Sequence, residues 1–310
     1  MSTVDAIRSR SDTQLFACFS CSLLSLSLSL GAFNPFFRNH NGLRFADQDP
    51  GSFSPSIVDS NRRAVEIRYT LLPYLYTLFH RVHISGGTVV RSMAHEFARD
   101  ATAWSIDEQF LWGSHLLIAP VIHENETTKH VYLPSSDRWF DYYTGEEQTK
   151  LGLINVAAEY DFIPLFVRGG AILARQQSAM NTVKARRTPM NLLLTLDRRN
   201  EAQGNLFWDD GDSIDTYRTS AYNYFHFVYR TRRLNIRHLT YKYPRMGEEI
   251  KLDAITIYGL RHQPRDIRWN DQHLSNTKWI YNASLNVLKM QALALNLSDT
   301  HRFTFSSAND

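Results

Sequence analysis

Two short stretches carry the side chains best suited to chemistry. The first is "RNHN" (Arg38–Asn41), which places His40 directly after the apolar run "GAFNPFF". A histidine in that position could bind a hydroxyl group or move a proton. The second is "WDDGDS" (Trp208–Ser213), whose three carboxylates suggest a calcium loop or an acid–base pair.

The acidic stretch lacks the spacing that either chemistry requires. A helix-loop-helix calcium site continues to a glutamate at the twelfth position, which counted from Asp209 is Ser220. Carboxylates that cleave glycosidic bonds face each other from different strands, about 5 to 9 Å apart. We therefore predict a structural β-turn in which Gly211 takes a positive φ and the aspartates accept hydrogen bonds from backbone amides.

No cofactor or metal site is predicted. The only two cysteines, Cys18 and Cys21, form "CFSC" without a second ligand pair nearby. The chain has no phosphate-loop, nucleophile-elbow or HExxH motif. Its 34 basic and 31 acidic residues are interspersed, with a net charge of +3, so no nucleic-acid partner is predicted.

The elements that would position these residues are one helix and many strands. From Ile57 to His83 apolar residues recur at helical spacing and predict one amphipathic helix, with a kink near Pro73 and an end at Gly86-Gly87. The positions expected to face the core are Val65, Leu72, Leu75, Leu78, Phe79 and Val82. From Thr88 onward, short alternating runs separated by Gly, Pro, Asn and Asp predict antiparallel β-structure.

Six blocks along the chain carry a family resemblance. They are "GAFNPFFRNHN", "RYTLLPYLYTLFHRVHISGGTVVRSMAHEF", "DEQFLWGSHLLIAPVI", "VYLPSSDRWFDYYTGE", "IPLFVRGGAIL" and "GNLFWDDGDSIDTY". In this order they resemble glycoside hydrolase family 31, in particular the branch of lysosomal acid α-glucosidase and the intestinal maltase and sucrase enzymes. The resemblance implies a glycosidase that releases glucose from α-linked oligosaccharides.

The resemblance also implies a mostly β fold: the last strand-helix unit of a (β/α)8 barrel, then proximal and distal antiparallel β-sandwich domains. "AFNPFF" would be the barrel strand. The expected divisions are residues 31–95 for the end of the catalytic barrel, 96–180 for the proximal domain and 181–310 for the distal domain. Residues 1–30 are Ser/Leu-rich and outside the resemblance, and are interpreted as translated intron or as a weak signal or anchor.

In the family pattern His40 matches a histidine that hydrogen-bonds a hydroxyl of the sugar in the cleavage subsite, and Arg38 would make a supporting ion pair. The family's nucleophile and acid/base aspartates lie in blocks that these 310 residues do not contain. No catalytic residue is therefore assigned, the chain alone is expected to be inactive, and whether it acts as an enzyme stays open.

The expected ligand is an α-glucoside oligosaccharide, and a separate chain carrying the rest of the barrel would be a complementing partner. Three glycosylation sequons, at Asn125, Asn282 and Asn296, together with the resemblance, predict the secretory pathway, whether lysosomal, extracellular or membrane-associated. The alternative is a non-catalytic secreted β-sandwich module that binds carbohydrate or a partner protein. In that case exposed tryptophans would stack on sugar rings, and the candidates are Trp139, Trp208, Trp269 and Trp279.

Overall fold

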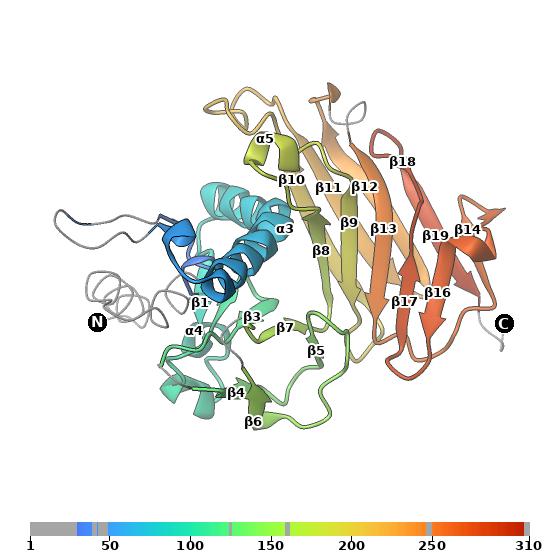
Figure 1. Cartoon of the computed structure of the whole chain (residues 1–310). Coiled ribbons are helices and arrows are strands. Elements are labelled where there is room, and N and C mark those ends of the chain that lie inside the picture. Colours follow the sequence, from blue (N-terminus) through green and yellow to red (C-terminus); the bar gives the residue numbers. More distant parts are fainter. Residues whose placement is uncertain are drawn as a thin grey trace. The chain divides into compact units, whose positions relative to one another are not determined.

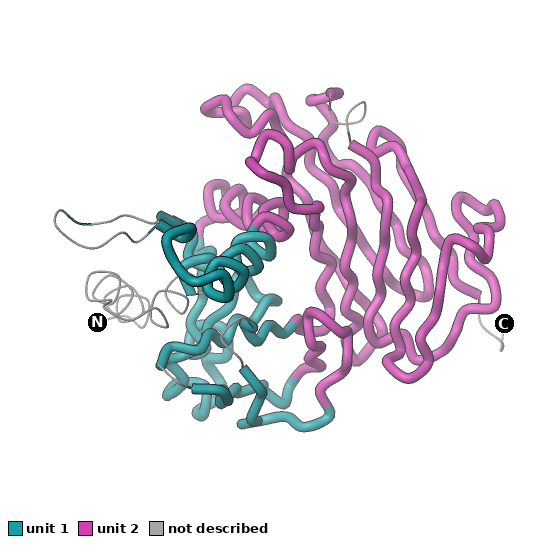
Figure 2. The backbone as a smooth tube through the Cα atoms, viewed as in Figure 1, with its two compact units in different colours: residues 1–68, 87–136, 149–166 teal, residues 69–86, 137–148, 167–310 magenta. Residues whose placement is uncertain are grey.

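The computed structural model describes residues 30–38, 42, 49–123, 126–158, 162–245 and 250–306 (Figure 1). The chain divides into two compact units, colored separately in Figure 2. Unit 1 comprises residues 1–68, 87–136 and 149–166, and unit 2 comprises residues 69–86, 137–148 and 167–310. Among the described residues, no helix is long and apolar enough to cross a membrane.

The predicted long helix is present as α3 (Pro55–Ser85). It ends where the sequence indicates, because Gly86 and Gly87 take φ values of 74° and 92° that favor glycine. Pro73 lies inside it. Residues up to Arg68 belong to unit 1 and residues from Tyr69 onward to unit 2.

The buried face of α3 differs partly from the predicted one. Leu75 and Leu78 are buried as expected, and Leu71 joins them at helical spacing. Phe79, however, is 41% exposed, whereas the neighboring His80 is buried. The apolar pattern alone did not distinguish these two adjacent positions.

Unit 1 contains two small antiparallel arrangements. Strands β1 (Val90–Ser92), β2 (Phe110–Trp112) and β3 (Leu116–Ile118) pair in that order, and β4 (Thr128–Leu133) pairs with β6 (Gly152–Ala157). The short helix α4 (Met93–Glu96) follows β1. All residues of β2 and β3 are buried, which explains why they read as continuous apolar runs.

Unit 2 contains β5 (Trp139–Asp141) and the largest sheet. The boundary between the units falls within strand β7 (Leu165–Arg168): residues up to Phe166 belong to unit 1 and residues from Val167 to unit 2. The sheet has 12 strands in the order β15-β14-β19-β12-β11-β10-β8-β9-β13-β17-β16, with β18 pairing with β13. Their bounds are β8 Ala171–Gln176, β9 Met190–Thr195, β10 Ala202–Trp208, β11 Asn223–Arg230, β12 Arg233–Tyr241, β13 Lys251–Tyr258, β14 Asp266–Trp269, β15 Gln272–His273, β16 Trp279–Asn282, β17 Val287–Met290, β18 Leu295–Asn296 and β19 His301–Ser306.

This sheet confirms the predicted β-rich fold. Its pairs are antiparallel except β9 with β13 and β8 with β10, which are parallel. Residues from strands throughout the sheet, including Leu192, Phe227, Ile257 and Phe303, share one hydrophobic core. The side chains on the buried face of this sheet therefore pack against one another in a single core, as in a β-sandwich. A short helix, α5 (Thr182–Ala185), connects β8 to β9.

The segment predicted as a barrel strand does not form one. Residues 32–36 form turns and bends, with the Phe33 amide donating to the Leu30 carbonyl and the Asn34 amide to the Gly31 carbonyl. A parallel strand is stabilized by hydrogen bonds to its neighbors, and none of the described residues pairs with this segment as a strand. The segment therefore has hydrogen bonds within local turns and no hydrogen bonds to a neighboring strand among the described residues.

Candidate functional site

The loop that leads to the predicted sugar-binding histidine is packed in unit 1. Ala32 and Phe33 are fully buried, and Phe36 is 79% exposed. The loop therefore has an inner part that is packed and an outer part that faces solvent. Its carbonyl groups need donors, because a buried unpaired carbonyl is costly.

Arg68 of α3 supplies those donors. Its Nη1 donates to the carbonyls of Ala32 (2.7 Å) and Asn34 (2.6 Å), and its Nη2 donates to that of Pro35 (3.0 Å). Arg68 is only 8% exposed. The planar guanidinium suits this task because it directs several donors into one loop at once.

Aromatic contacts complete the support of the loop. The indole Nε1 of Trp112, in β2, donates to the Phe33 carbonyl at 2.6 Å. The Arg68 guanidinium lies 5.3 Å from the ring centroid of Phe37 and 5.9 Å from that of Trp112. These cation–π distances, in a buried setting, make the guanidinium the center of the anchor.

Of the two residues that the resemblance assigned to the site, only Arg38 lies among the described residues. Arg38 is exposed and makes no ion pair with the described residues. His40 lies outside the described residues. The hydrogen bond predicted for His40 and the ion pair predicted for Arg38 therefore stay predictions, and the anchor ends at Phe37.

The acidic stretch in unit 2 surrounds one buried carboxylate. Asp209 is 1% exposed. Its oxygens accept hydrogen bonds from the Tyr76 hydroxyl (3.0 and 3.1 Å), the Thr216 hydroxyl (2.6 Å) and the Gly211 amide (2.9 Å). Burial, followed by the adjacent Asp209, raises the pKa of Tyr76, so its hydroxyl stays a donor.

The turn prediction for this stretch is confirmed. Gly211 takes φ 75°, and a Cβ there would lie 2.7 Å from the Arg186 guanidinium carbon. Asp210 accepts from the backbone amides of Asp212 (3.1 Å) and Ser213 (2.9 Å). Asp209 and Asp210 therefore accept hydrogen bonds from amides of their own loop, as the turn prediction requires.

Arg186 also holds this loop. It donates to the Asp209 carbonyl, and its guanidinium lies 4.0 Å from the Trp208 ring centroid. The close approach explains why position 211 is glycine.

His80 of α3 lies in an aromatic cluster in unit 2. Its ring stacks on Phe207 with centroids 3.9 Å apart, and Tyr217, Tyr222 and Tyr224 lie 5.3 to 5.8 Å away. Burial, and secondarily the charge of His83, lowers its pKa to about 4, although Asp209 acts in the opposite direction. His80 is therefore neutral in the folded protein at neutral pH.

We expect His80 to make unit 2 sensitive to acid. The unfolded chain, with an ordinary histidine pKa near 6.5, binds the proton more readily than the folded chain. The contribution of neutral His80 to the free energy of unfolding is thus fully present above pH 6.5. Up to roughly 3 kcal/mol of this contribution is lost as the pH falls toward 4. Urea unfolding of wild type and His80→Gln across this range measures the effect.

The matched control is His262→Gln, because His262 is exposed. The His80 variant is expected to lose stability less steeply with acid than wild type, and the His262 variant to follow wild type. Equal pH slopes for all three proteins would contradict the assignment.

Other predicted site residues can be placed in part. Asn282 and Asn296 are exposed, as glycosylation requires, and Asn125 lies outside the described residues. The Asn282 side-chain oxygen accepts from the Ser284 amide at 3.0 Å and so shapes its own turn. Across the part of the chain that the structure describes, no group of three or more His, Cys, Asp or Glu residues is arranged to hold a metal ion.

Sequence reasoning missed the two residues that anchor these loops through α3, Arg68 and Tyr76. Each stands in the helix as an ordinary polar position. The available signal was that Arg68 falls three residues before Leu71 on the buried face of the helix, where an arginine must find partners.

Family comparisons agree with the sequence blocks. Residues 20–78 match the model "Glycosyl hydrolases family 31 TIM-barrel domain", and residues 86–173 match "Glycosyl hydrolase family 31 C-terminal domain". The first match begins within the Ser/Leu-rich segment.

Similar proteins carry related names but are much longer. The chain is 43% identical over 234 residues to human "Probable maltase-glucoamylase 2", covering 75% of this chain and 9% of that protein. It is 35% identical over 266 residues to mouse "Lysosomal alpha-glucosidase", covering 80% of this chain and 28% of that protein. The chain therefore spans less than a third of the length of these relatives.

A solved structure shares the fold. The glucosidase II alpha subunit, in a form described as bound to alpha3-Glc2, matches with a TM-score of 0.83 and 22% identity, covering 92% of this chain and 33% of that one. The fold, the ordered sequence blocks and the two family models agree, and this chain belongs to glycosyl hydrolase family 31.

Proposed function

We propose that these residues are the C-terminal portion of an α-glucosidase that releases glucose from α-linked oligosaccharides, and that they contribute His40 to its sugar subsite. The observation that carries the proposal is the anchored loop at residues 31–37, which ends three residues before His40. Arg68 and Trp112 hold its backbone, so that a side chain following it would have a defined starting point.

The relatives support the substrate class. Their names are maltase-glucoamylase, sucrase-isomaltase and lysosomal α-glucosidase, and identities range from 34% to 45%. We therefore assign α-glucosides as the substrates of the whole enzyme and glucose as the product. Arg38 would support the site from the same loop.

The 310 residues alone should not catalyze the reaction. Retaining hydrolysis requires a nucleophile that forms a glycosyl-enzyme and an acid that protonates the departing oxygen. Loss of a positioned acid or base costs about 10² to 10⁴ in rate, and loss of the nucleophile removes the covalent pathway. Asp209, the most buried carboxylate of the acidic stretch, is committed to its own loop.

Maltose hydrolysis by the purified full chain tests this proposal. We expect no glucose release above a blank, under conditions in which a complete family enzyme is active. A second arm co-expresses a polypeptide carrying the rest of the barrel, with His40→Ala as the comparison. Activity that appears only with the second polypeptide and falls in the His40 variant would support both the complementing partner and the role of His40. Glucose release by the chain alone would contradict the prediction that these 310 residues are inactive without a second polypeptide.

The carbohydrate-binding module is the weaker candidate. Of its four tryptophans, Trp139 and Trp208 are buried, and Trp269 and Trp279 are partly buried against the hydrophobic core. Their position indicates a packing role for at least the first two. We propose the secretory pathway as the location, which agrees with the words "lysosomal" and "intestinal" in the relatives' names and with the exposed sequons at Asn282 and Asn296.

A further inference from the structure

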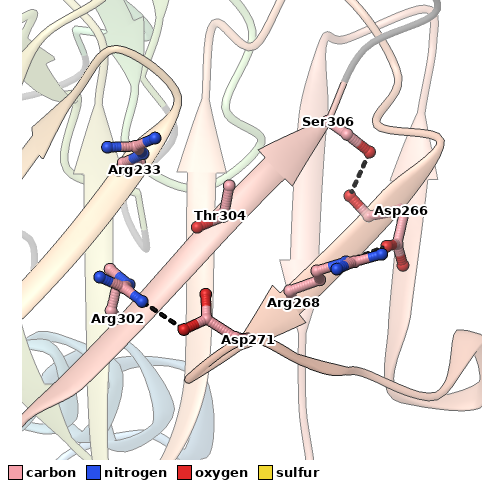
Figure 3. Close-up of a pocket in the computed structure, with 7 residues that line it drawn as sticks. All are labelled: Arg233, Asp266, Arg268, Asp271, Arg302, Thr304 and Ser306. Atoms are coloured by element: carbon pink, nitrogen blue, oxygen red, sulfur yellow. Dashed lines mark hydrogen bonds and ion pairs between the residues drawn. The ribbon is translucent and has the colours of Figure 1, made fainter. Parts of the chain in front are cut away.

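The outer face of unit 2 carries a cluster of charged and hydroxyl side chains on three adjacent strands. Strand β19 alternates strictly, with His301, Phe303 and Phe305 buried and the residues between them facing outward. The outward residues are Arg302, Thr304 and Ser306. They line a cavity of about 380 Å³ together with Arg233, Asp266, Arg268 and Asp271 (Figure 3).

Strand register places two arginines on either side of Thr304. Arg233 of β12 is the direct partner of Thr304 on one side, and Arg268 of β14 is its direct partner on the other. Directly opposed side chains point to the same face with Cβ atoms about 5 Å apart. Arg233, Thr304 and Arg268 therefore form a row of residues across the three strands.

Ion pairs orient two of the arginines and leave the third uncommitted. Arg268 Nε donates to Asp266 at 2.9 Å, and Arg302 Nη2 donates to Asp271 at 2.5 Å. Arg233 makes no ion pair with any residue that the structure describes. The lining has three arginines against two aspartates, so it carries one excess positive charge.

Asp266 acts as a positioning residue in this cluster. One of its oxygens accepts from Arg268, and the other contacts His273 Nδ1 at 2.6 Å. This fixes one edge of the Arg268 guanidinium and leaves the remaining N–H groups of that side chain available. A guanidinium with free N–H groups suits a tetrahedral oxyanion, which accepts paired hydrogen bonds.

We propose that this cavity binds a sulfate or phosphate group, seated over Thr304 and bridged by Arg233 and Arg268. The Thr304 hydroxyl donates to one oxygen of the anion, and Arg302 adds positive charge at the side of the cavity. A neutral sugar is not the expected ligand, because the lining contains no aromatic ring on which a sugar could stack.

Isothermal calorimetry on the full chain tests the site, with inorganic phosphate, inorganic sulfate and glucose 6-phosphate as probes and glucose as the uncharged comparison. Ionic strength is held constant with sodium chloride, because exposed charges are screened by salt. We expect saturable one-site binding of the anions and none of glucose. Tighter binding of glucose 6-phosphate than of inorganic phosphate would identify an ester as the ligand, whereas equal affinities would identify the free ion.

Variants separate a built site from general charge attraction. Arg233→Gln and Thr304→Val are each expected to weaken anion binding, the first by about tenfold. The matched control is Arg237→Gln, because Arg237 is exposed on the same face of β12 and does not line the cavity. It should stay within about twofold of wild type.

Two results would overturn the proposal. One is the absence of saturable anion binding up to a concentration on the order of 10 mM. The other is equal weakening by Arg233→Gln and Arg237→Gln, which would show attraction to net charge without a defined site. Circular dichroism and a thermal melt of each variant test whether the substitutions leave the fold intact.

Discussion

Replacement of Arg68 by alanine is expected to release the loop at residues 31–37 and to destabilize unit 1 by about 3 kcal/mol. The substitution removes the donors of three carbonyl groups, those of Ala32, Asn34 and Pro35. Ala32 is fully buried, and a carbonyl left buried without a partner costs about 1 to 3 kcal/mol. The bonds to Asn34 and Pro35 are part-buried, so their loss costs less. The substitution also removes the cation that lies 5.3 Å from the ring centroid of Phe37 and 5.9 Å from that of Trp112.

Hydrogen exchange of the full chain measures the release directly. The amides of Phe33 and Asn34 close the local turns, so they report whether the loop keeps its conformation. In the Arg68→Ala protein they should exchange much faster than in wild type, while amides of the large sheet in unit 2 keep their protection. Arg68→Lys keeps the positive charge but loses the planar guanidinium with its several donors. Its amide exchange rates are expected to lie between those of wild type and Arg68→Ala.

The control for Arg68 is Arg62→Ala on the same helix. Arg62 is exposed and pairs with Asp59 at 2.8 Å, an interaction worth less than about 1 kcal/mol. Equal exchange rates in the Arg62 and Arg68 variants would show that the guanidinium of Arg68 does not hold the loop.

These anchors mark where sequence reasoning succeeded and where it stopped. The helix from Pro55 to Ser85 was predictable because its apolar spacing and its terminal glycines are local signals. The turn at Gly211 was predictable for the same reason. The conformation of "AFNPFF" was not, because it depends on what lies beside it: a strand needs a neighboring strand, and here the partners are Arg68 and Trp112.

Strand β12 shows a second limit of sequence reasoning. Its segment, Arg233–Tyr241, contains two arginines and a histidine, and only Leu234 and Ile236 are buried apolar residues in it. The turn before it is formed by Thr231 and Arg232, with φ values of 49° and 55°, although glycine and asparagine usually fill such positions. The residue types in this region therefore indicated neither the strand nor the turn. For the same reason the row of Arg233, Thr304 and Arg268 becomes visible only through strand register.

The candidate sugar site could be predicted only as a motif. The blocks located the family and His40, whereas nothing local in the sequence indicated that an arginine 28 positions later would bind the carbonyls before it. Long-range side-chain to backbone bonds leave no periodic signature in a single sequence. The same holds for Tyr76 and Asp209, which lie 133 residues apart along the chain.

Replacement of Asp209 by alanine is expected to destabilize unit 2 by about 3 to 5 kcal/mol. The carboxylate is buried, and its removal leaves three donors without their acceptor: the hydroxyls of Tyr76 and Thr216 and the amide of Gly211. The Tyr76 bond ties α3 to the end of β10. A second tie lies beside it, because the Phe207 amide donates to the Thr77 hydroxyl at 3.0 Å. Loss of Asp209 should therefore loosen the helix on the sheet as well as the loop.

Urea unfolding of the full chain, followed by tyrosine and tryptophan fluorescence, measures this loss. Asp209→Asn keeps the shape and one acceptor oxygen, and the hydroxyl of Thr216 or Tyr76 can rotate to accept from the new amide, so we expect a smaller loss than for alanine. Asp212→Ala is the matched control, because Asp212 is an exposed acid of the same loop and should change stability by less than about 0.5 kcal/mol. If the alanine variants at positions 209 and 212 unfold at the same urea concentration, the buried carboxylate does not hold the helix and the loop together. A loss confined to position 209, and halved by asparagine, would assign the acidic stretch to the architecture of unit 2 and not to catalysis.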